Sequence, residues 1–413
     1  MRKMLKSCIG VSALLLAAFI APAHAFECGN GICDPGCDIG CGKVSSLWYY
    51  GGHMEAGLYA NSHGQRNVYD CNGNWPVNGW NTGSGNSALL GTARLADIQM
   101  NQLYGYFGKK LNTRCGWDIG GRVDFMYGTD AFYTQSRGFE YGAGHGHWGS
   151  GDYLSSIPQL YGEIGYRNVS VKLGKFYTPF GHEGIMSTER FFYSTGYGFN
   201  ILPDTQTGAL ATWAINPCLS VYGGWTNGED VIESYSFDTS DNNAALFGFN
   251  YKLGRKAHIG YGVLMGENKK SSAIVALPIP GGATKNEYFV HAFNFGYKLN
   301  RCWDYNFEWT LRNNNAEPGH THVAAYGIGQ ELIYKMNRCW AFGLRGDWMY
   351  ENTLNDANFY GLTLGANWTP NKWLLVRPEV RYDYCDVNGG YFTTSAVAKK
   401  DQIGAGVSTI VKF

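Results

Sequence analysis

Strict alternation of aromatic and polar residues constrains this chain more than any other feature. Residues 303–312 read WDYNFEWTLR, so every second side chain is aromatic or aliphatic and the others are polar or charged. Successive side chains of a β-strand point to opposite faces, so this segment predicts a strand with one apolar and one charged face. The same alternation recurs around residues 117–127, 342–350 and 374–383. A two-sheet sandwich explains one such hairpin, whereas many of them favour a membrane-spanning barrel, in which the apolar face meets lipid.

The pattern predicts sixteen strands separated alternately by short turns and long loops. The short turns share a signature, as in Asn300-Arg301-Cys302-Trp303 and Asn337-Arg338-Cys339-Trp340. An even strand count places both termini on the short-turn side, which is periplasmic in outer-membrane barrels. The fold class is therefore all-β, a transmembrane antiparallel β-barrel. The predicted strands lie near residues 46–60, 89–109, 117–128, 157–167, 169–178, 208–215, 219–227, 243–253, 257–266, 286–299, 303–312, 322–336, 340–351, 358–368, 373–383 and 401–413.

Composition agrees with a barrel and gives no sign of a nucleic-acid partner. Aromatic residues make up 15% of the 413 residues, 57 residues are Gly, and charged residues are only 16%. Aromatic belts at two membrane interfaces and a polar interior require such a mixture. The formal net charge is zero, so no basic surface for nucleic acid is expected.

The two ends of the chain carry export and assembly signals. Arg2, Lys3 and Lys6 precede a short apolar stretch, and Ala23-His24-Ala25 is typical of a signal-peptidase site. We therefore expect a signal peptide at 1–25, a Cys-rich periplasmic segment at 26–43 and the barrel at 44–413. The terminal Phe413 closes an alternating strand and resembles the signal by which outer-membrane barrels engage the barrel assembly machinery.

Residues 171–183, VKLGKFYTPFGHE, carry a family resemblance. The stretch resembles the G-K-F-x-T-P-F-G-x-E segment of the OmpL-like barrels called β-barrel porin-2. The resemblance implies an outer-membrane location, contact with membrane lipid and passive diffusion of small hydrophilic solutes, but it implies no particular solute. The cysteine content departs from that of ordinary porins, which are poor in Cys.

The motif opens the third long loop, residues 179–207, which general porins fold into the lumen as a constriction. Glu183, Glu189 and Arg190 are the residues that we expect to set the charge there. Strand residues on the polar faces are expected to line the pore: Arg122, Asp124, Asp304, Glu308, Arg312, Arg345, Asp347, Arg377, Glu379, Arg381 and Asp383. Because their charges nearly cancel, weak charge selectivity is expected. The alternative is that residues 179–207 form an ordinary extracellular loop that does not enter the lumen.

Eleven cysteines are present, and ten remain once the signal peptide with Cys8 is removed. An even number in an oxidising compartment predicts disulfides, with a metal or iron–sulfur centre as the alternative. Cys28, Cys33, Cys37 and Cys41 precede the first strand, whereas Cys115, Cys218, Cys302 and Cys339 lie in predicted periplasmic turns. These cysteines could form disulfides between the N-terminal segment and the turns, or between neighbouring turns, and the sequence does not decide between the two arrangements. Cys71 and Cys385 lie in the first and last long loops, which a closed barrel makes neighbours, so we predict a Cys71–Cys385 bridge.

Other functions have weaker support. The pairs His145/His147 and His320/His322 could bind zinc or copper, but no further ligand is placed beside them, so we expect neither a metal nor a cofactor. No catalytic constellation stands out on adjacent strands, so an enzyme is not expected. A structural or adhesive barrel without an open pore is the main alternative to a channel. A homotrimer is common among porins of this size, and the sequence leaves the oligomeric state open.

Overall fold

The computed structural model describes residues 47–63, 97–141, 147–150, 152–230, 232, 243–268, 286–316, 323–352, 356–388, 391–393 and 398–413. Within these ranges, the chain is almost entirely β-structure. No helix in the described parts is long and apolar enough to cross a bilayer.

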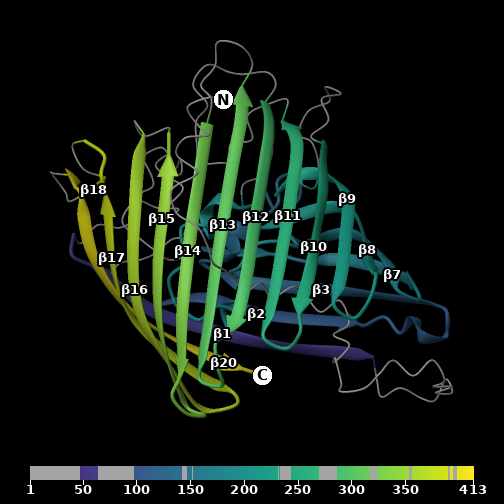
Figure 1. Ribbon diagram of the computed structural model, residues 1–413, viewed down its shortest axis with the longest axis horizontal. Coiled ribbons are helices and arrows are strands. Elements are labelled where there is room, and N and C mark those ends of the chain that lie inside the picture. Colours follow the sequence, from purple (N-terminus) through teal and green to yellow (C-terminus); the bar gives the residue numbers. More distant parts are fainter. Residues whose placement is uncertain are drawn as a thin grey trace.

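Sixteen long strands, counted over the described residues, form one closed antiparallel barrel (Figure 1). Each strand pairs with its neighbour in the chain, and β20 closes the cylinder by pairing with both β17 and β1. The predicted strand number and fold class are confirmed. The strands are β1 (Trp48–Asn61), β2 (Gln99–Lys109), β3 (Trp117–Gly128), β6 (Leu160–Tyr166), β7 (Val169–Tyr177), β8 (Thr205–Ala214), β9 (Leu219–Glu229), β10 (Asn243–Leu253), β11 (Ala257–Asn268), β12 (Asn286–Lys298), β13 (Trp303–Ala316), β14 (Val323–Lys335), β15 (Trp340–Glu351), β16 (Ala357–Asn371), β17 (Leu374–Cys385) and β20 (Asp401–Lys412).

Short elements occupy the connections. They are the 3-10 helices η1 (Thr113–Cys115), η2 (Ser187–Glu189) and η3 (Phe199–Ile201), the α-helical turn α2 (Ala131–Thr134), and the strands β4 (Gly149–Ser150), β5 (Tyr153–Ser156), β18 (Phe392–Thr393) and β19 (Ala398–Lys399). The second barrel strand begins at Gln99, whereas we expected a start near residue 89; residues 89–96 lie outside the described ranges.

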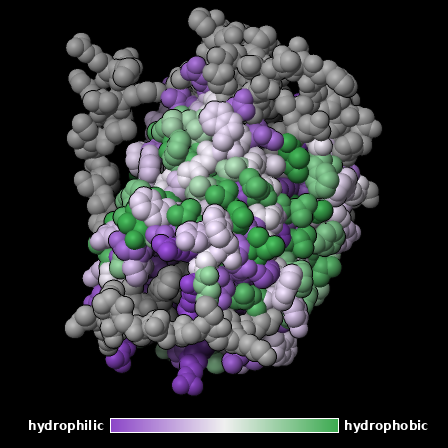
Figure 2. Space-filling model, turned by 90° about the vertical axis from the view of Figure 1, so that its right-hand side faces the viewer, coloured by the Kyte–Doolittle hydropathy of each residue, from purple (hydrophilic) through white to green (hydrophobic). Residues whose placement is uncertain are grey.

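The outer surface of the barrel carries the aromatic and aliphatic residues of the alternating pattern. Trp117 and Ile119 of β3 are 73% and 67% exposed, while Asp124 of the same strand is buried inside. Hydrophobic side chains gather across the side of the barrel, as Figure 2 shows for one face. Exposing this much apolar surface is unfavourable in water, so this face suits lipid.

The repeated Asn of the short turns has a defined structural role. In four turns an Asn Oδ1 accepts the backbone N–H groups two and three residues later: Asn216, Asn300, Asn337 and Asn371. This Asx turn satisfies backbone donors at the strand ends. Three of these turns hold Cys at the first donor position, whereas Trp373 occupies it in the fourth, so the turn itself does not require Cys.

Candidate functional site: the loop inside the barrel

The long connection between β7 and β8, residues 178–204 and here called loop L3, lies inside the barrel. Its first half contacts the inner faces of β12 and β13: Asn294 donates to the Gly181 carbonyl at 2.8 Å, and the His182 N–H donates to Glu308 at 2.6 Å. Its second half reaches β17, where the Tyr197 hydroxyl donates to Asp383 at 2.6 Å. Since β7 and β17 lie on opposite sides of a sixteen-strand cylinder, L3 crosses the lumen. Residues 205–207, which we assigned to the loop, belong to β8.

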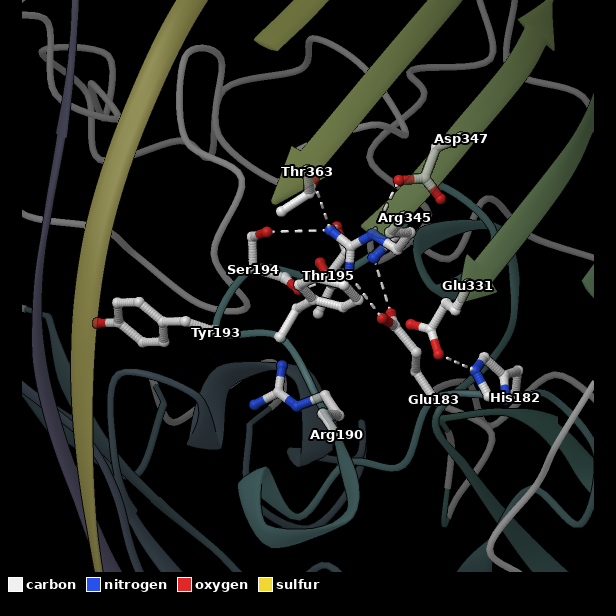
Figure 3. A network of polar contacts seen from close by, with 12 residues as sticks. His182, Glu183, Arg190, Tyr193, Ser194, Thr195, Glu331, Arg345, Asp347 and Thr363 are labelled. Carbon is white, nitrogen blue, oxygen red and sulfur yellow. Dashed lines mark hydrogen bonds and ion pairs between the residues drawn. The ribbon is translucent and has the colours of Figure 1, made fainter. Parts of the chain in front are cut away.

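Arg345 of β15 is the centre of the contacts between L3 and this wall (Figure 3). Its Nη1 donates to Glu183 Oε1 at 2.9 Å and to the Ser194 carbonyl at 2.8 Å. Its Nη2 donates to Ser194 Oγ at 2.9 Å, and its Nε pairs with Asp347 at 2.9 Å. One guanidinium thus joins both arms of L3 to the strand, which matches the five-donor fork of Arg.

Three more arginines of the wall donate to backbone carbonyls of L3. Arg377 Nη1 donates to the carbonyls of Ser187, Arg190 and Phe192 at 3.0, 3.0 and 3.1 Å. Arg381 and Arg312 do the same at Thr195 and Ile201, with distances of 2.6 and 2.9 Å. The same arginines form ion pairs with Glu55, Asp383 and Glu229. These bonds satisfy loop carbonyls that would otherwise be buried without donors.

Carboxylates of the wall satisfy the donors of L3. The two oxygens of Glu379 accept the backbone N–H groups of Tyr193 and Ser194 at 2.8 and 3.0 Å. The loop backbone is therefore held by acids as well as by arginines, and hydrogen bonds to charged groups are stronger than neutral ones.

Glycines of the inner wall leave room for the aromatic rings of L3. A Cβ at Gly343 or Gly365 would lie 2.8 or 2.9 Å from the Phe192 ring, and a Cβ at Gly57 would lie 2.5 Å from the Tyr193 hydroxyl. Ordinary carbon–carbon contacts are about 3.5–4.0 Å, so only Gly allows the rings to lie this close to the strands.

His182 adds a charged contact on the β14 side. Its Nε2 lies 2.8 Å from Glu331 Oε2, and both side chains are nearly buried. Burial lowers the pKa of His182, but Glu331, Glu308 and Glu183 outweigh this and raise the pKa to about 9. His182 is therefore a cation at neutral pH, paired with Glu331.

A second connection, residues 129–159 between β3 and β6, packs against L3. Lys175 of β7 pairs with Glu140 at 2.8 Å, and Ile185 and Phe199 of L3 pack against Ala131 and Leu154. This contact was not predicted, because nothing in the local sequence of residues 129–159 distinguishes an inward-folded loop from an outer one.

The predicted site residues fall into different environments. Glu183 pairs with Arg345, Glu189 is half-buried, and Arg190 is buried with Asp130 as its ion-pair partner at 3.6 Å. The predicted lining residues all lie on barrel strands. Two of them form ion pairs away from L3: Asp304 pairs with Lys335 near the turns, and Arg122 pairs with Asp124 at 2.6 Å. The four arginines that hold L3 are at most 3% exposed, so L3 covers them and they do not border open space. The sequence analysis did not include His182 or Glu331 among the candidate site residues. The alternating pattern of β14 indicates that Glu331 points inward, but nothing in the sequence indicates that His182 of L3 is its partner.

The cysteines require one correction. Cys385 is a free thiol, which contradicts the predicted Cys71–Cys385 bridge. Cys385 ends β17 and packs as a small apolar side chain in a buried cluster with Phe359 and Phe392. Cys302 and Cys339 are also free, Cys115 lies in η1, and Cys218 is partly exposed in its turn. Cys28, Cys33, Cys37, Cys41 and Cys71 lie outside the described residues.

Only one histidine of the two candidate pairs lies in the described part of the chain. His147 stacks on Tyr141 with ring centroids 4.7 Å apart and bonds to Gln135, whereas His145, His320 and His322 lie outside the described residues. No group of three His, Cys, Asp or Glu side chains that could hold a metal occurs among the residues that are described.

A closed sixteen-strand barrel with a lipid-facing apolar surface and a loop fixed across its lumen defines an outer-membrane porin-type barrel. The chain belongs to the family described as Putative beta-barrel porin-2, OmpL-like, whose model matches residues 63–413. It is thus an outer-membrane channel protein by family.

Solved porins share the fold at low sequence identity. OmpT, an outer membrane protein of Vibrio cholerae in its trimer form, is 12% identical with a TM-score of 0.57, and the match covers 90% of this chain and all of that one. The anion-selective porin from Comamonas acidovorans is 11% identical with a TM-score of 0.55, covering 89% and 100%. OprB of Pseudomonas putida is 12% identical with a TM-score of 0.52, covering 89% and 94%. Comparison with curated protein sequences gives no match.

Proposed function

We propose that this protein is a narrow, water-filled outer-membrane channel for passive diffusion of small hydrophilic solutes, with loop L3 as its constriction. The observation that carries the proposal is the anchoring of L3 to the far wall through Arg345, Arg377 and Arg381. A sixteen-strand barrel is wide enough for an aqueous channel, and a loop across it reduces the passage to small solutes.

Channel recordings in planar bilayers, together with swelling of liposomes in sugars of graded size, test the proposal. Stable open steps and a sharp size limit are expected. Folded protein that gives neither steps nor swelling would leave the alternative, a structural or adhesive barrel with a closed lumen. The inward packing of residues 129–159 against L3 is the observation that favours that alternative.

Export and assembly belong to the same proposal. The signal peptide 1–25 is cleaved, the segment 26–43 stays on the periplasmic side, and Phe413 engages the barrel assembly machinery. Mutual backbone hydrogen bonds between Phe413 and Gly52, both 2.9 Å, support a role for the last residue in closing the barrel. A homotrimer is the proposed assembly, supported by the trimeric form of the Vibrio cholerae protein of similar fold.

Disulfides between the N-terminal segment and the periplasmic turns are also proposed. Cys115 in η1 is disulfide-bonded, and the oxidising compartment favours such pairing for the other turn cysteines. Peptide mapping without reductant tests this, and alkylation of every turn cysteine in native protein would exclude it.

A further inference from the structure

Three arginines of the barrel wall, Arg345, Arg377 and Arg381, are here called the wall arginines. They hold L3 with the same guanidinium nitrogens that would otherwise donate hydrogen bonds to a permeating anion. Arg345, Arg377 and Arg381 are at most 2% exposed, and each donates to at least one loop carbonyl while pairing with a carboxylate. Ordered backbone dipoles and neighbouring carboxylates thus surround each positive charge. An anion in the lumen meets the loop and not the guanidinium groups.

The space beside L3 has the opposite charge. A recess of about 60 Å³ is lined by L3 residues, Tyr177 and Glu308. Its charged lining groups are Glu183, Glu189, Asp204, Glu308 and His182, and neither Lys nor Arg takes part. Two of these groups already have ion-pair partners, His182 with Glu331 and Glu183 with Arg345. The acids that remain are Glu189, Asp204 and Glu308, and burial raises the pKa of Glu189 to about 7, so the recess is most acidic above that pH.

The one arginine within L3 lies on another side of the loop. Arg190 is buried, with Asp130 as its ion-pair partner at 3.6 Å, and it does not line the recess.

We infer that the wall arginines are positioning residues that set the width of the passage through L3, so that carboxylates determine the charge selectivity and the channel prefers small cations. This inference rests on the proposed open channel and names the class of its solutes. It replaces the weak selectivity expected from the sequence, where the arginines were counted as exposed lining.

A charge-conserving substitution separates positioning from electrostatics. Arg345→Lys keeps one positive charge but cannot donate to Glu183, Ser194 and Asp347 together, since an ammonium lacks the planar fork. If Arg345 positions the loop, Arg345→Lys changes single-channel conductance and increases current noise while the channel still prefers cations. If Arg345 acts only through its charge, the lysine variant behaves as the native protein, which would overturn the positioning role.

The selectivity itself is read from the reversal potential across a KCl gradient at about 0.1 M salt, where charges act over about 10 Å. Native channels are expected to pass K⁺ in preference to Cl⁻. The double variant Glu189→Gln with Glu308→Gln, recorded at about pH 8.5, should lower the K⁺/Cl⁻ permeability ratio by about twofold or more, because two lining carboxylates are removed. The pH is set above the pKa of Glu189, which burial raises to about 7. Asp401→Asn, at an exposed carboxylate where β20 begins, is the matched control and should leave the ratio unchanged.

The outcomes distinguish this inference from the proposed function. Open channels that prefer Cl⁻ or show no preference refute the cation preference and leave the channel intact. Folded protein without any channels refutes the proposed function and this inference with it.

Discussion

Replacing Gly343 by alanine should loosen loop L3, whereas the same change at Gly346, three residues along β15, should not. A Cβ at Gly343 would overlap the Phe191 ring and lie 2.8 Å from Phe192 Cζ, while a Cβ at Gly346 would have nothing within 4 Å. Ordinary contacts are about 3.5–4.0 Å, so both rings must shift by roughly 1 Å or the loop must leave the wall.

The magnitude follows from the cost of overpacking. Inserting a methyl group into a packed contact costs about 1–3 kcal/mol. Both variants share the backbone gain of about 0.5–1 kcal/mol for exchanging Gly by Ala in a strand. The free energies of unfolding of the two variants should therefore differ by about 1–3 kcal/mol, with Gly343→Ala the less stable.

Urea unfolding of protein folded in lipid vesicles, followed by tryptophan fluorescence, measures this difference. Single-channel recordings of the same preparations should show added current noise for Gly343→Ala alone, since the displaced loop borders the passage. Equal unfolding midpoints and equal noise for both variants would refute the packing of Phe191 and Phe192 on Gly343.

Three further predictions concern L3 and the C-terminus. Glu379→Gln replaces a charged acceptor of the Tyr193 N–H and should destabilise the protein by about 2 kcal/mol in the same urea assay, whereas an unchanged midpoint would show that the bond contributes nothing. Because the folded-state pKa of His182 is raised to about 9, its contribution to stability is complete below about 6.5 and is lost as the pH rises through about 9. The native protein should therefore lose stability between pH 7 and pH 10, and His182→Gln should lose less over the same range. If both proteins lose stability equally, the His182–Glu331 pair is not the cause of that loss. Deleting Phe413 should reduce insertion into the outer membrane, measured by fractionation of whole cells; normal insertion would remove its assembly role.

The strands were predictable because their information is local. Alternation at residues 303–312 depends only on neighbouring side chains, and the outward Trp309 and inward Glu308 follow from the pleat. The turns were predictable for the same reason, since an Asn such as Asn300 bonds to backbone groups two and three residues away. Local alternation repeated sixteen times also determined closure, because an even set of antiparallel neighbours brings β20 beside β1.

The site was predictable only in part. The sequence indicated that Arg345 faces inward and that Glu183 lies in a long loop, but it could not indicate that these two groups meet. Their contact joins residues 162 positions apart, and it depends on where the loop enters the cylinder. The same limit explains the Cys385 error, since adjacency of two loops does not determine where a side chain packs.

The sequence by itself thus determined the barrel, its lipid-facing surface and its strand order, because a two-residue period and short turns are properties of neighbouring residues. Only the tertiary structure decided that the arginines of β13, β15 and β17 hold L3 and that carboxylates face the remaining space. The physical reason is that the carbonyls and carboxylates beside a buried guanidinium offset its charge, and which of them lie beside it depends on contacts between distant parts of the chain.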